Sequence, residues 1–388
     1  MKSTSTDIVV IGGGSAGMCA AIAGARAGAR VVLLERSNTL GGMGTLAKVH
    51  TFCGLYLPDV SQPPRIANPG MPAEIESRMR ALTGVDPVRM GKVYVLPQDP
   101  VAFARIAREL TSAEPRLEVF YQAACAALTR HAGGSFTVET PDHAITCRAI
   151  VDASADAAAA PLLGATRIAE PETTRQRSAM IFSMENVAPA AREDAFRMRL
   201  ALDIVRAVER GELPAAAMDT TCRASARAGE IHFTTDLDPA PRDVLLASGA
   251  SIAASLASFL RANYAEYAQA SGPAMAAEPG IRESFRWLGQ STLTAEDLLG
   301  GRTFDDHAAF ATWPIELRET TRGPHFRFLK LPAGIPIRCL TSLEIEGVFF
   351  AGRCLSATHE ALASVRVMGT CFATGQAAGK AAAAFVRG

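Results

Sequence analysis

Short apolar runs and glycine-rich turns alternate at the start of the chain. Residues 8–11 (IVVI) and 31–34 (VVLL) are continuous apolar runs, and an alanine-rich segment between them ends at Gly28. A continuous apolar run is typical of a strand buried on both faces, and an alanine-rich segment favours a helix. The first 35 residues therefore predict a strand–helix–strand unit, the building block of a parallel sheet.

The same pattern returns near the end of the chain. Residues 348–351 form a short apolar run, and residues 367–385 carry small residues at helical spacing. We expect another strand of the parallel sheet, followed by a helix. The elements predicted between the two ends are a helix over 99–110, a strand over 117–127 and a small β-meander over 136–140 and 145–153.

The pattern in the middle of the chain predicts a second sheet of a different kind. Residues 176–185 and 231–235 have strand patterns, and residues 195–210 and 250–268 have helical ones. An antiparallel sheet with helices on one side is the natural arrangement. The expected fold class is α/β, with a Rossmann-like domain (a parallel sheet with a β-meander) and an α+β domain with an antiparallel sheet.

The turn after the first strand has the spacing of a dinucleotide-binding loop. Residues 12–17 read GGGSAG, and Glu35 follows the second strand. Gly12 permits a tight turn, Gly14 lets the backbone approach a pyrophosphate, and Gly17 lets the helix lie close on the strand. The helix N-terminus favours phosphate, and Glu35 can accept hydrogen bonds from a ribose. A glycine turn without a ligand is the alternative, which the strand, helix and acid together disfavour.

A second glycine cluster follows this acid. Residues 36–45 read RSNTLGGMGT. Glycine here lets the chain pass close to the rest of a long cofactor, which favours FAD over NAD; an ordinary glycine-rich loop is the alternative. The stretch resembles the N-terminal FAD fingerprint of the glutathione-reductase-like and fumarate-reductase-like flavoproteins.

Four further motifs carry a resemblance to one family. They are GIRES at 280–284, IPIRCL at 335–340, AGRCLSATHE at 351–360 and SVRVM at 364–368. With the N-terminal fingerprint, they resemble the bacterial FAD-dependent oxidoreductase family, kin to heterodisulfide-reductase flavin subunits. The resemblance covers both ends of the chain and 280–310, is weak over 166–279, and does not specify a substrate.

The resemblance implies where FAD would lie. A late strand reaches the ribityl chain in such flavoproteins, and the next helix points at the flavin C2 carbonyl; this chain has Arg353 where many relatives have aspartate. Residues 153–155 (ASA) replace the family's ATG segment. His50 is out of register with the histidine of fumarate reductases that holds flavin, so non-covalent FAD is expected. The residues expected to contact FAD are Gly12, Gly14, Ser15, Ala16, Gly17, Glu35, Arg36, Gly41, Gly42, Met43, Cys125, Ala153, Ser154, Gly352, Arg353, Val367 and Met368.

Length favours two lobes, because 388 residues exceed one typical hydrophobic core. The FAD-binding domain is expected over 1–165 and 331–388, and a substrate domain over 166–330. Residues 56–95, rich in proline and arginine, are expected to form a loop and short helix near the active site.

Charge and hydropathy limit the kinds of binding partner and the location that we expect. Lysine plus arginine equals aspartate plus glutamate, 39 each, so no nucleic-acid partner is expected. No apolar stretch approaches eighteen residues free of charge and glycine, so we expect neither a signal peptide nor a membrane span, and a cytoplasmic location. The oligomeric state is left open, with a homo-oligomer among the options.

The eight cysteines are scattered. No two form a C-x-x-C motif, which argues against a local zinc, iron–sulfur or redox-disulfide site, and no metal is expected. Most are interpreted as small apolar residues in a reducing compartment. Cys53, Cys354 and Cys371 are the candidates for a part in chemistry.

The candidate chemistry lies in polar residues expected between the lobes. Arg366 is suited to stabilise negative charge at the flavin N1–C2 carbonyl, and a salt bridge beside the helix is an equal alternative. His359 could exchange a proton beside flavin N5, and capping is the alternative. The pair at 282–283 fits a substrate clamp or an internal salt bridge. The remaining candidates are Arg282, Glu283, Arg338 and Glu360.

These features predict an FAD-dependent oxidoreductase that moves a hydride between a small organic substrate and flavin N5. Arginines 282, 338 and 353, joined by Arg65, Arg78 or Arg89, would favour an anionic substrate. NAD(P)H has no Rossmann domain of its own, so O2, a quinone or a partner protein is left as electron acceptor. The alternatives are a flavin monooxygenase, whose internal D-G and late G-D segments are missing, and a tRNA-directed flavoprotein, which the neutral charge disfavours.

Overall fold

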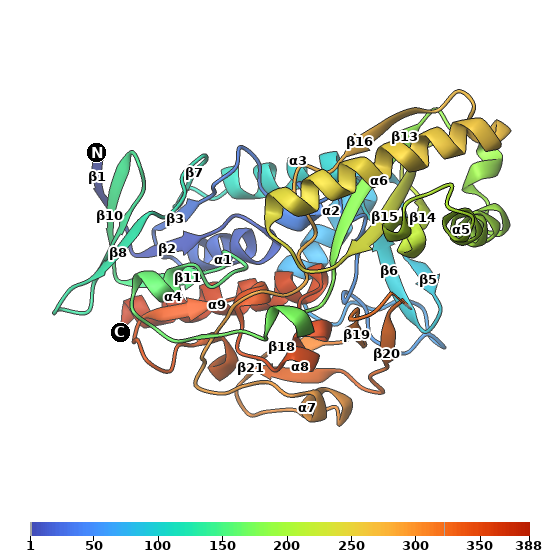
Figure 1. The fold of residues 1–388 in the computed structure, drawn as a ribbon. Coiled ribbons are helices and arrows are strands. Elements are labelled where there is room, and N and C mark those ends of the chain that lie inside the picture. Colours follow the sequence, from blue (N-terminus) through green and yellow to red (C-terminus); the bar gives the residue numbers. More distant parts are fainter. Residues whose placement is uncertain (1, 322) are drawn as a thin grey trace.

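A parallel five-stranded sheet forms the centre of the first lobe in this computed structural model, which describes residues 2–321 and 323–388 (Figure 1). Every neighbouring pair of strands in it is parallel. The strands lie in the order β22 (Val348–Phe350), β11 (Ala149–Asp152), β2 (Ile8–Ile11), β3 (Val31–Leu34) and β7 (Leu117–Phe120). The last strand of the chain thus completes a sheet that the first residues begin, as expected.

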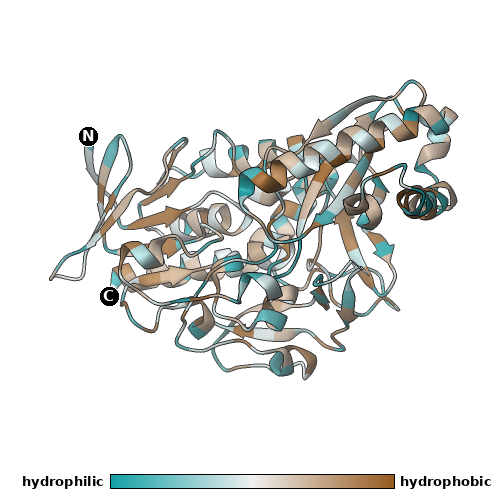
Figure 2. Ribbon diagram, viewed as in Figure 1, coloured by the Kyte–Doolittle hydropathy of each residue, from teal (hydrophilic) through white to brown (hydrophobic). Residues whose placement is uncertain are grey.

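Alternate residues of this sheet pack on opposite faces. Val10 and Leu33 lie in the core with the helices, whereas Val9 and Val32 lie in the core with the β-meander. The helices on the first face are α1 (Ser15–Arg26), α2 (Met71–Thr83), α3 (Pro100–Ser112) and α9 (Met368–Arg387). Because both faces are covered, the strands are continuously apolar, and they are brown in Figure 2.

The first and last helices, α1 and α9, pack in close contact. A Cβ atom at Gly375 would lie 2.1 Å from the backbone oxygen of Ala16, and one at Gly379 would lie 2.1 Å from that of Ala20. Only glycine permits this approach, which explains the small residues of the last helix.

The predicted strand over 117–127 is wrong in one respect. It is divided between β7, in the parallel sheet, and β8 (Ala127–Arg130), in the meander. Gln122 adopts a left-handed φ of 55° between them, where the chain turns. The meander comprises β8, β9 (Phe136–Glu139) and β10 (His143–Cys147), and β1 (Lys2–Ser5) adds to β10 in parallel.

The second lobe is an antiparallel sheet covered by helices, as expected. The strand order is β14 (Thr221–Ala224), β15 (Ile231–Leu237), β13 (Ser178–Glu185) and β16 (Ser271–Met275). The long helix α6 (Arg242–Asn263) crosses this sheet in Figure 1, and α5 (Asp194–Glu209) lies at its far end. By length and composition alone α6 could cross a membrane, with 39% of its most apolar window buried here. Its Leu245, Ile252, Leu256 and Leu260 belong to the core of the lobe.

A third group of elements packs against α9 and shares one core with it. The elements are β18 (His307–Ala311), β21 (Ala333–Pro336), β19 (Ile315–Leu317), β20 (His325–Arg327), α7 (Ala295–Leu299) and α8 (His359–Val365). The expected boundary at 330/331 falls between the paired strands β18 and β21. The remaining elements are β4 (Thr51–Phe52), β5 (Val88–Met90), β6 (Val93–Pro97), α4 (Ala159–Leu162), β12 (Arg167–Ile168) and β17 (Arg286–Trp287).

Candidate functional site

A cavity of about 510 Å³ lies between the two lobes. One end is lined by the glycine turn after β2, the end of β11 and the start of α9; residues of β13, β14 and β15 line the other end. The carboxyl ends of the parallel strands therefore face the antiparallel sheet across the cavity, where open α/β sheets bind their ligands.

The glycine turn fits a pyrophosphate. At Gly12 the φ is +98°, and at Gly17 an added Cβ would lie 1.7 Å from the Gly12 oxygen, so both positions are closed to side chains. At Gly14 the nearest atom to an added Cβ is 3.9 Å away, on Gly42, so the backbone is open to the cavity. The N-terminus of α1 begins there and offers N–H groups that have no partner inside the helix.

Glu35 lies at the position expected for a ribose ligand. Its side chain is buried, lines the cavity, and accepts hydrogen bonds of 2.7 Å from the backbone N–H groups of Gly13 and Ser37. A carboxylate has about four acceptor positions, so capacity remains for a ribose hydroxyl.

All of the predicted FAD-contact residues except Gly17 and Gly41 line this cavity. Gly17 packs on Gly12, and an added Cβ at Gly41 would lie 2.6 Å from Thr45, so both shape the turn from outside the cavity. Together with the open backbone at Gly14, this lining fits a dinucleotide.

The segment that replaces the family's ATG keeps a glycine-like conformation. Ala155 has a φ of +73°, which L-residues rarely adopt. Its carbonyl oxygen accepts hydrogen bonds from Ser284 Oγ (3.1 Å) and Arg353 Nε (3.2 Å). Arg353 also donates to Asp156 (2.7 Å) and to the carbonyl of Ile281, so its guanidinium ties the lobes together although the residue lines the cavity.

Arg366 is a half-buried arginine without a carboxylate partner. It donates to Gln176 Oε1 (3.2 Å) and to the Glu316 carbonyl (3.4 Å), and its Nε is buried with no hydrogen-bond partner. In the described part of the chain it forms no ion pair, so the alternative of a salt bridge beside the helix is not what the structure holds. Burial lowers the pKa of Arg366 to about 10, which leaves it charged at neutral pH.

Two other arginines of this end, Arg282 and Arg318, are paired with carboxylates. Arg282 donates to Asp236 (2.7 Å), and Arg318 bridges Asp236 and Glu316 at 2.7 Å each. Arg282 is therefore not paired with Glu283, and the alternative of a salt bridge between these two neighbours is not what the structure holds. Burial acts to raise the pKa of Glu316, but Arg318 and then Arg366 lower it below its usual range, so it stays ionised.

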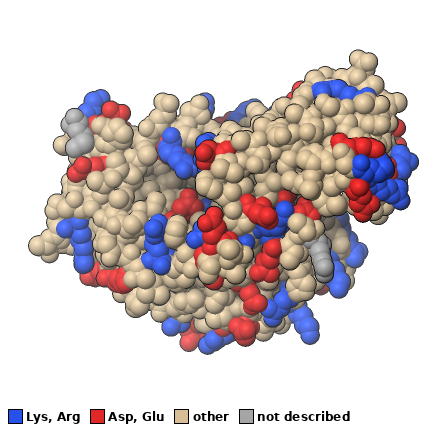
Figure 3. All heavy atoms as spheres, viewed as in Figure 1, with Lys and Arg blue, Asp and Glu red and all other residues tan. Residues whose placement is uncertain are grey.

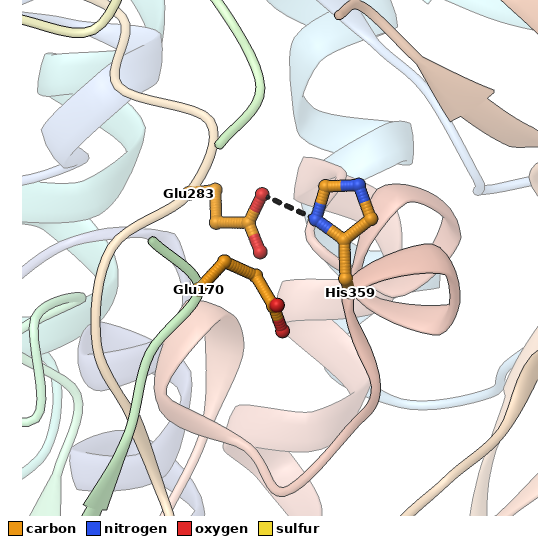
Figure 4. A group of neighbouring side chains, drawn as sticks. All are labelled: Glu170, Glu283 and His359. Carbon is orange, nitrogen blue, oxygen red and sulfur yellow. Dashed lines mark ion pairs between the residues drawn. The ribbon is translucent and has the colours of Figure 1, made fainter. Parts of the chain in front are cut away.

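His359, Glu283 and Glu170 form a separate cluster outside the cavity lining (Figure 4). His359 Nδ1 lies 2.8 Å from Glu283, and Arg286 bridges Glu283 (2.6 Å) and Glu170 (2.8 Å). The positive charges of Arg286 and His359 already neutralise the two carboxylates, which disfavours a metal ion. The hydrogen bond to Glu283 raises the pKa of His359 to about 9, so this histidine is charged at neutral pH and is poorly suited to act as a base.

Two other candidates lie at the surface, where each side chain pairs with a residue of opposite charge. Arg338 pairs with Asp306 (2.9 Å) and Glu360 with Arg327 (3.3 Å). Neither pair lines the cavity. The arginines proposed for the mouth from the first lobe, Arg65, Arg78 and Arg89, do not line it either; from 56–95 the cavity receives Met90.

The residues that sequence reasoning missed belong to the far end of the cavity. They lie on strands and turns of 166–279, where the family resemblance is weak, and on the segment around β19. They include Ala179, Ile181, Thr221, Arg223, Thr234, Trp313, Glu316 and Arg318, with His50, Thr51 and Met90 from the first lobe. The sequence offered one signal for these residues: a polar side chain, such as that of Thr234, on the face of a predicted strand that would turn toward the other lobe.

All eight cysteines are free. Cys53, Cys125 and Cys371 line the cavity. Cys354 does not; it packs beside Asp152 under the parallel sheet. Burial raises the pKa of Cys53 and of Cys371 to about 12, so both are thiols at neutral pH and weak nucleophiles.

The family of FAD dependent oxidoreductases matches residues 7–388. Among solved structures, a geranylgeranyl bacteriochlorophyll reductase-like protein from Thermoplasma acidophilum aligns over 99% of this chain and 79% of its own, with 10% identity and a TM-score of 0.51. The p-nitrophenol 4-monooxygenase from Pseudomonas putida aligns over 92% and 74%, with 13% identity and a TM-score of 0.44. No curated protein matches the sequence. The glycine turn, the buried acid and this match over nearly the whole chain show that the protein belongs to the FAD-dependent oxidoreductase family.

Proposed function

We propose that this enzyme transfers a hydride between flavin N5 and a small organic anion held by Arg366. The observation that supports the anion is the guanidinium of Arg366, which lines the cavity without a carboxylate partner and has a buried Nε with no hydrogen-bond partner. A buried charge is costly unless it is paired, and a substrate carboxylate would supply the missing partner. Arg223, on the opposite wall, has Met90 Sδ (3.1 Å) as its hydrogen-bond partner in the described residues and offers a second guanidinium.

Charge at this end of the cavity supports the same assignment. Arg223, Arg282, Arg318 and Arg366 face the two carboxylates Asp236 and Glu316, so positive charge is in excess. Figure 3 shows acidic and basic side chains interspersed along the junction of the lobes outside the cavity. Within the cavity, a rigid guanidinium fork would orient a carboxylate.

FAD, when bound, supplies the electron pair acceptor or donor for this reaction. The residues that would hold it are the α1 N-terminus and Gly14, which suit a pyrophosphate, and Glu35, which suits a ribose. Arg366, immediately before the α9 N-terminus, adds positive charge where a reduced flavin would carry negative charge. Residues of β13, β14 and β15 also line the cavity.

The test is anaerobic reduction of the bound flavin by a panel of hydroxy acids, amino acids, amines and sugars, followed by absorbance. Anionic members of the panel should bleach the flavin. Arg366→Gln should weaken their binding by about 10- to 100-fold, the value of a charge-assisted hydrogen bond. The matched control is Arg338→Gln, which removes an exposed arginine outside the cavity and should change neither rate nor affinity. Bleaching by neutral substrates that is equally fast would refute the assignment of an anion.

A flavin monooxygenase is the alternative that the same experiment separates. A monooxygenase would need an external electron donor and would consume O2 only with an aromatic substrate present, whereas a dehydrogenase is reduced by its substrate alone. Kinship with the glutathione-reductase-like and fumarate-reductase-like flavoproteins rests on the sequence motifs, as does non-covalent binding, for which the test is release of all flavin by acid. A cytoplasmic location, the electron acceptor and the assembly state also stay predictions.

A further inference from the structure

We infer that His50 is the residue that exchanges the substrate proton, with His232 and Glu230 as its positioning residues. This inference rests on the proposed hydride transfer and adds to it the group that handles the accompanying proton. His359, the histidine favoured by the sequence, is outside the cavity lining and is held as a cation by Glu283 and Glu319.

His50 lies in the wall of the cavity at the end assigned to the substrate. It follows the second glycine cluster and lies next to Thr51, which also lines the cavity. Its backbone carbonyl accepts a hydrogen bond of 2.9 Å from Gln98, which fixes the main chain. Its Nδ1 is buried and has no hydrogen-bond partner, so a structural hydrogen bond does not occupy this nitrogen. An uncommitted imidazole facing a ligand cavity is available for proton transfer.

A second histidine supports this ring from behind. His232 of β15 stacks on His50, with the ring centroids 5.2 Å apart and the planes at 26°. His232 Nε2 lies 3.6 Å from Glu230, whose carboxylate is fixed by Ser225 Oγ at 2.6 Å. The series from Glu230 through His232 to His50 runs from the interior of the second lobe to the cavity wall. Burial acts against ionisation of Glu230, but its contacts with His232 and Ser225 lower its pKa to about 2.

The surroundings keep His50 neutral in the free enzyme. Burial, and then His232 and Arg223, lower the pKa of His50 to about 3, while the backbone of Lys48 acts weakly in the opposite direction. A neutral imidazole can accept a proton, which a charged one cannot. An anionic substrate placed against Arg223 would offset one of the charges that disfavour protonation, so His50 would become a stronger base when substrate is bound.

The proton and electron balance is as follows for substrate oxidation. The C–H bond breaks, and its hydrogen leaves with both bonding electrons as hydride to the flavin. The neighbouring O–H or N–H bond breaks, its electron pair forms the new C=O or C=N π bond, and its proton passes to His50. The imidazolium then returns this proton to water. For substrate reduction, each transfer is reversed and His50 donates the proton.

The kinetic test compares His50→Gln with His131→Gln. His131 is exposed on the β8–β9 hairpin and hydrogen-bonds to Thr137, so its variant is the matched control. With the substrates that bleach the wild-type flavin, His50→Gln should lower the rate constant of flavin reduction by about 100-fold or more, with little change in the saturation constant. Glu230→Gln should change the pH profile of that rate. Wild-type reduction rates in His50→Gln would overturn the inference.

The second test does not depend on turnover. In the FAD-bound protein with carbon-13 in its histidine rings, the His50 NMR signal is the one that remains in single variants of each of the six other histidines, so its assignment needs no His50 variant. This signal should keep a constant chemical shift between pH 5 and 8 without ligand, and it should shift when a non-reactive anionic substrate analogue is added; a His50 signal that the analogue leaves unchanged would overturn the inference. If no substrate of the panel reduces the wild-type flavin, the proposed function fails, whereas a fast His50→Gln enzyme refutes only the role of His50.

Discussion

Two glycines of the same turn should fail in opposite ways when replaced by alanine. At Gly17 the new Cβ would lie 1.7 Å from the Gly12 oxygen, about half of an ordinary carbon–oxygen contact of about 3.3 Å, and that oxygen is backbone and cannot rotate away. Overpacking of this kind typically destabilises a protein by about 1–3 kcal/mol. Because the neighbouring oxygen is rigid, the cost of Gly17→Ala should lie at the upper end of this range or above it. The free energy of unfolding of the FAD-free protein should fall accordingly.

At Gly14 the nearest atom would be 3.9 Å away and φ is −68°, so alanine fits. Alanine is a poorer N-cap residue than glycine, which destabilises the protein by about 0.5 kcal/mol. Alanine also lowers the conformational entropy of the unfolded chain, which stabilises the protein by about 0.5 kcal/mol, so the two effects offset each other. The FAD-free Gly14→Ala protein should therefore be as stable as wild type. Its Cβ, however, would stand between the α1 N-terminus and the pyrophosphate, and loss of one charge-assisted contact should weaken FAD binding by about 10- to 100-fold.

The assay combines urea unfolding of the FAD-free proteins with FAD titration followed by quenching of flavin fluorescence. Gly133→Ala, on a surface turn with no atom within 4 Å of the new Cβ, is the control for both measurements. Unchanged FAD affinity in Gly14→Ala would show that the pyrophosphate does not pass over this residue. Unchanged stability in Gly17→Ala would show that the helix does not lie as close to the turn as the structure has it.

Two further predictions concern stability. Because the pKa of His359 is raised to about 9, its ion pairs with Glu283 and Glu319 should stabilise the fold fully below about pH 6.5 and lose that contribution as pH rises to 9. The thermal unfolding temperature of wild type should fall over this pH range, and that of His359→Gln should not. Parallel pH profiles of the two proteins would contradict the prediction. Ala155→Gly should stabilise the protein by about 0.5–1 kcal/mol, because relief of the left-handed strain exceeds the added entropy of the unfolded chain; a lower urea midpoint than wild type would show that Ala155 is not strained.

The cofactor end of the site was predictable because its signals are local. Gly12, Gly14 and Glu35 lie within one strand–helix–strand unit, whose spacing alone determines their arrangement. The parallel sheet was predictable for a similar reason, since burial on both faces makes each strand continuously apolar. The break after Phe120 was not, because Gln122 is an uncommon residue for a left-handed turn.

The substrate end depends on pairings between distant segments. Arg223 and Thr234 reach the cavity only because β14 and β15 pair and lie over the first lobe. His359 shows the converse: its position in a conspicuous motif suggested catalysis, yet Glu283, far away in the sequence, pairs with it and fixes its charge. Such charge states follow from tertiary neighbours, which no local pattern of residues specifies.

The close contact between α1 and α9 has a consequence for the synthesis of the protein. The sheet begins with residues 8–11, but its edge strand β22 and the helix that covers it come from residues 348–387. A growing chain thus carries an unfinished cofactor half, with the apolar surface of α1 uncovered, while the antiparallel lobe is already complete in sequence. Chains released before α9 is made would expose that surface, which makes them targets for chaperones and proteases rather than partly active enzymes.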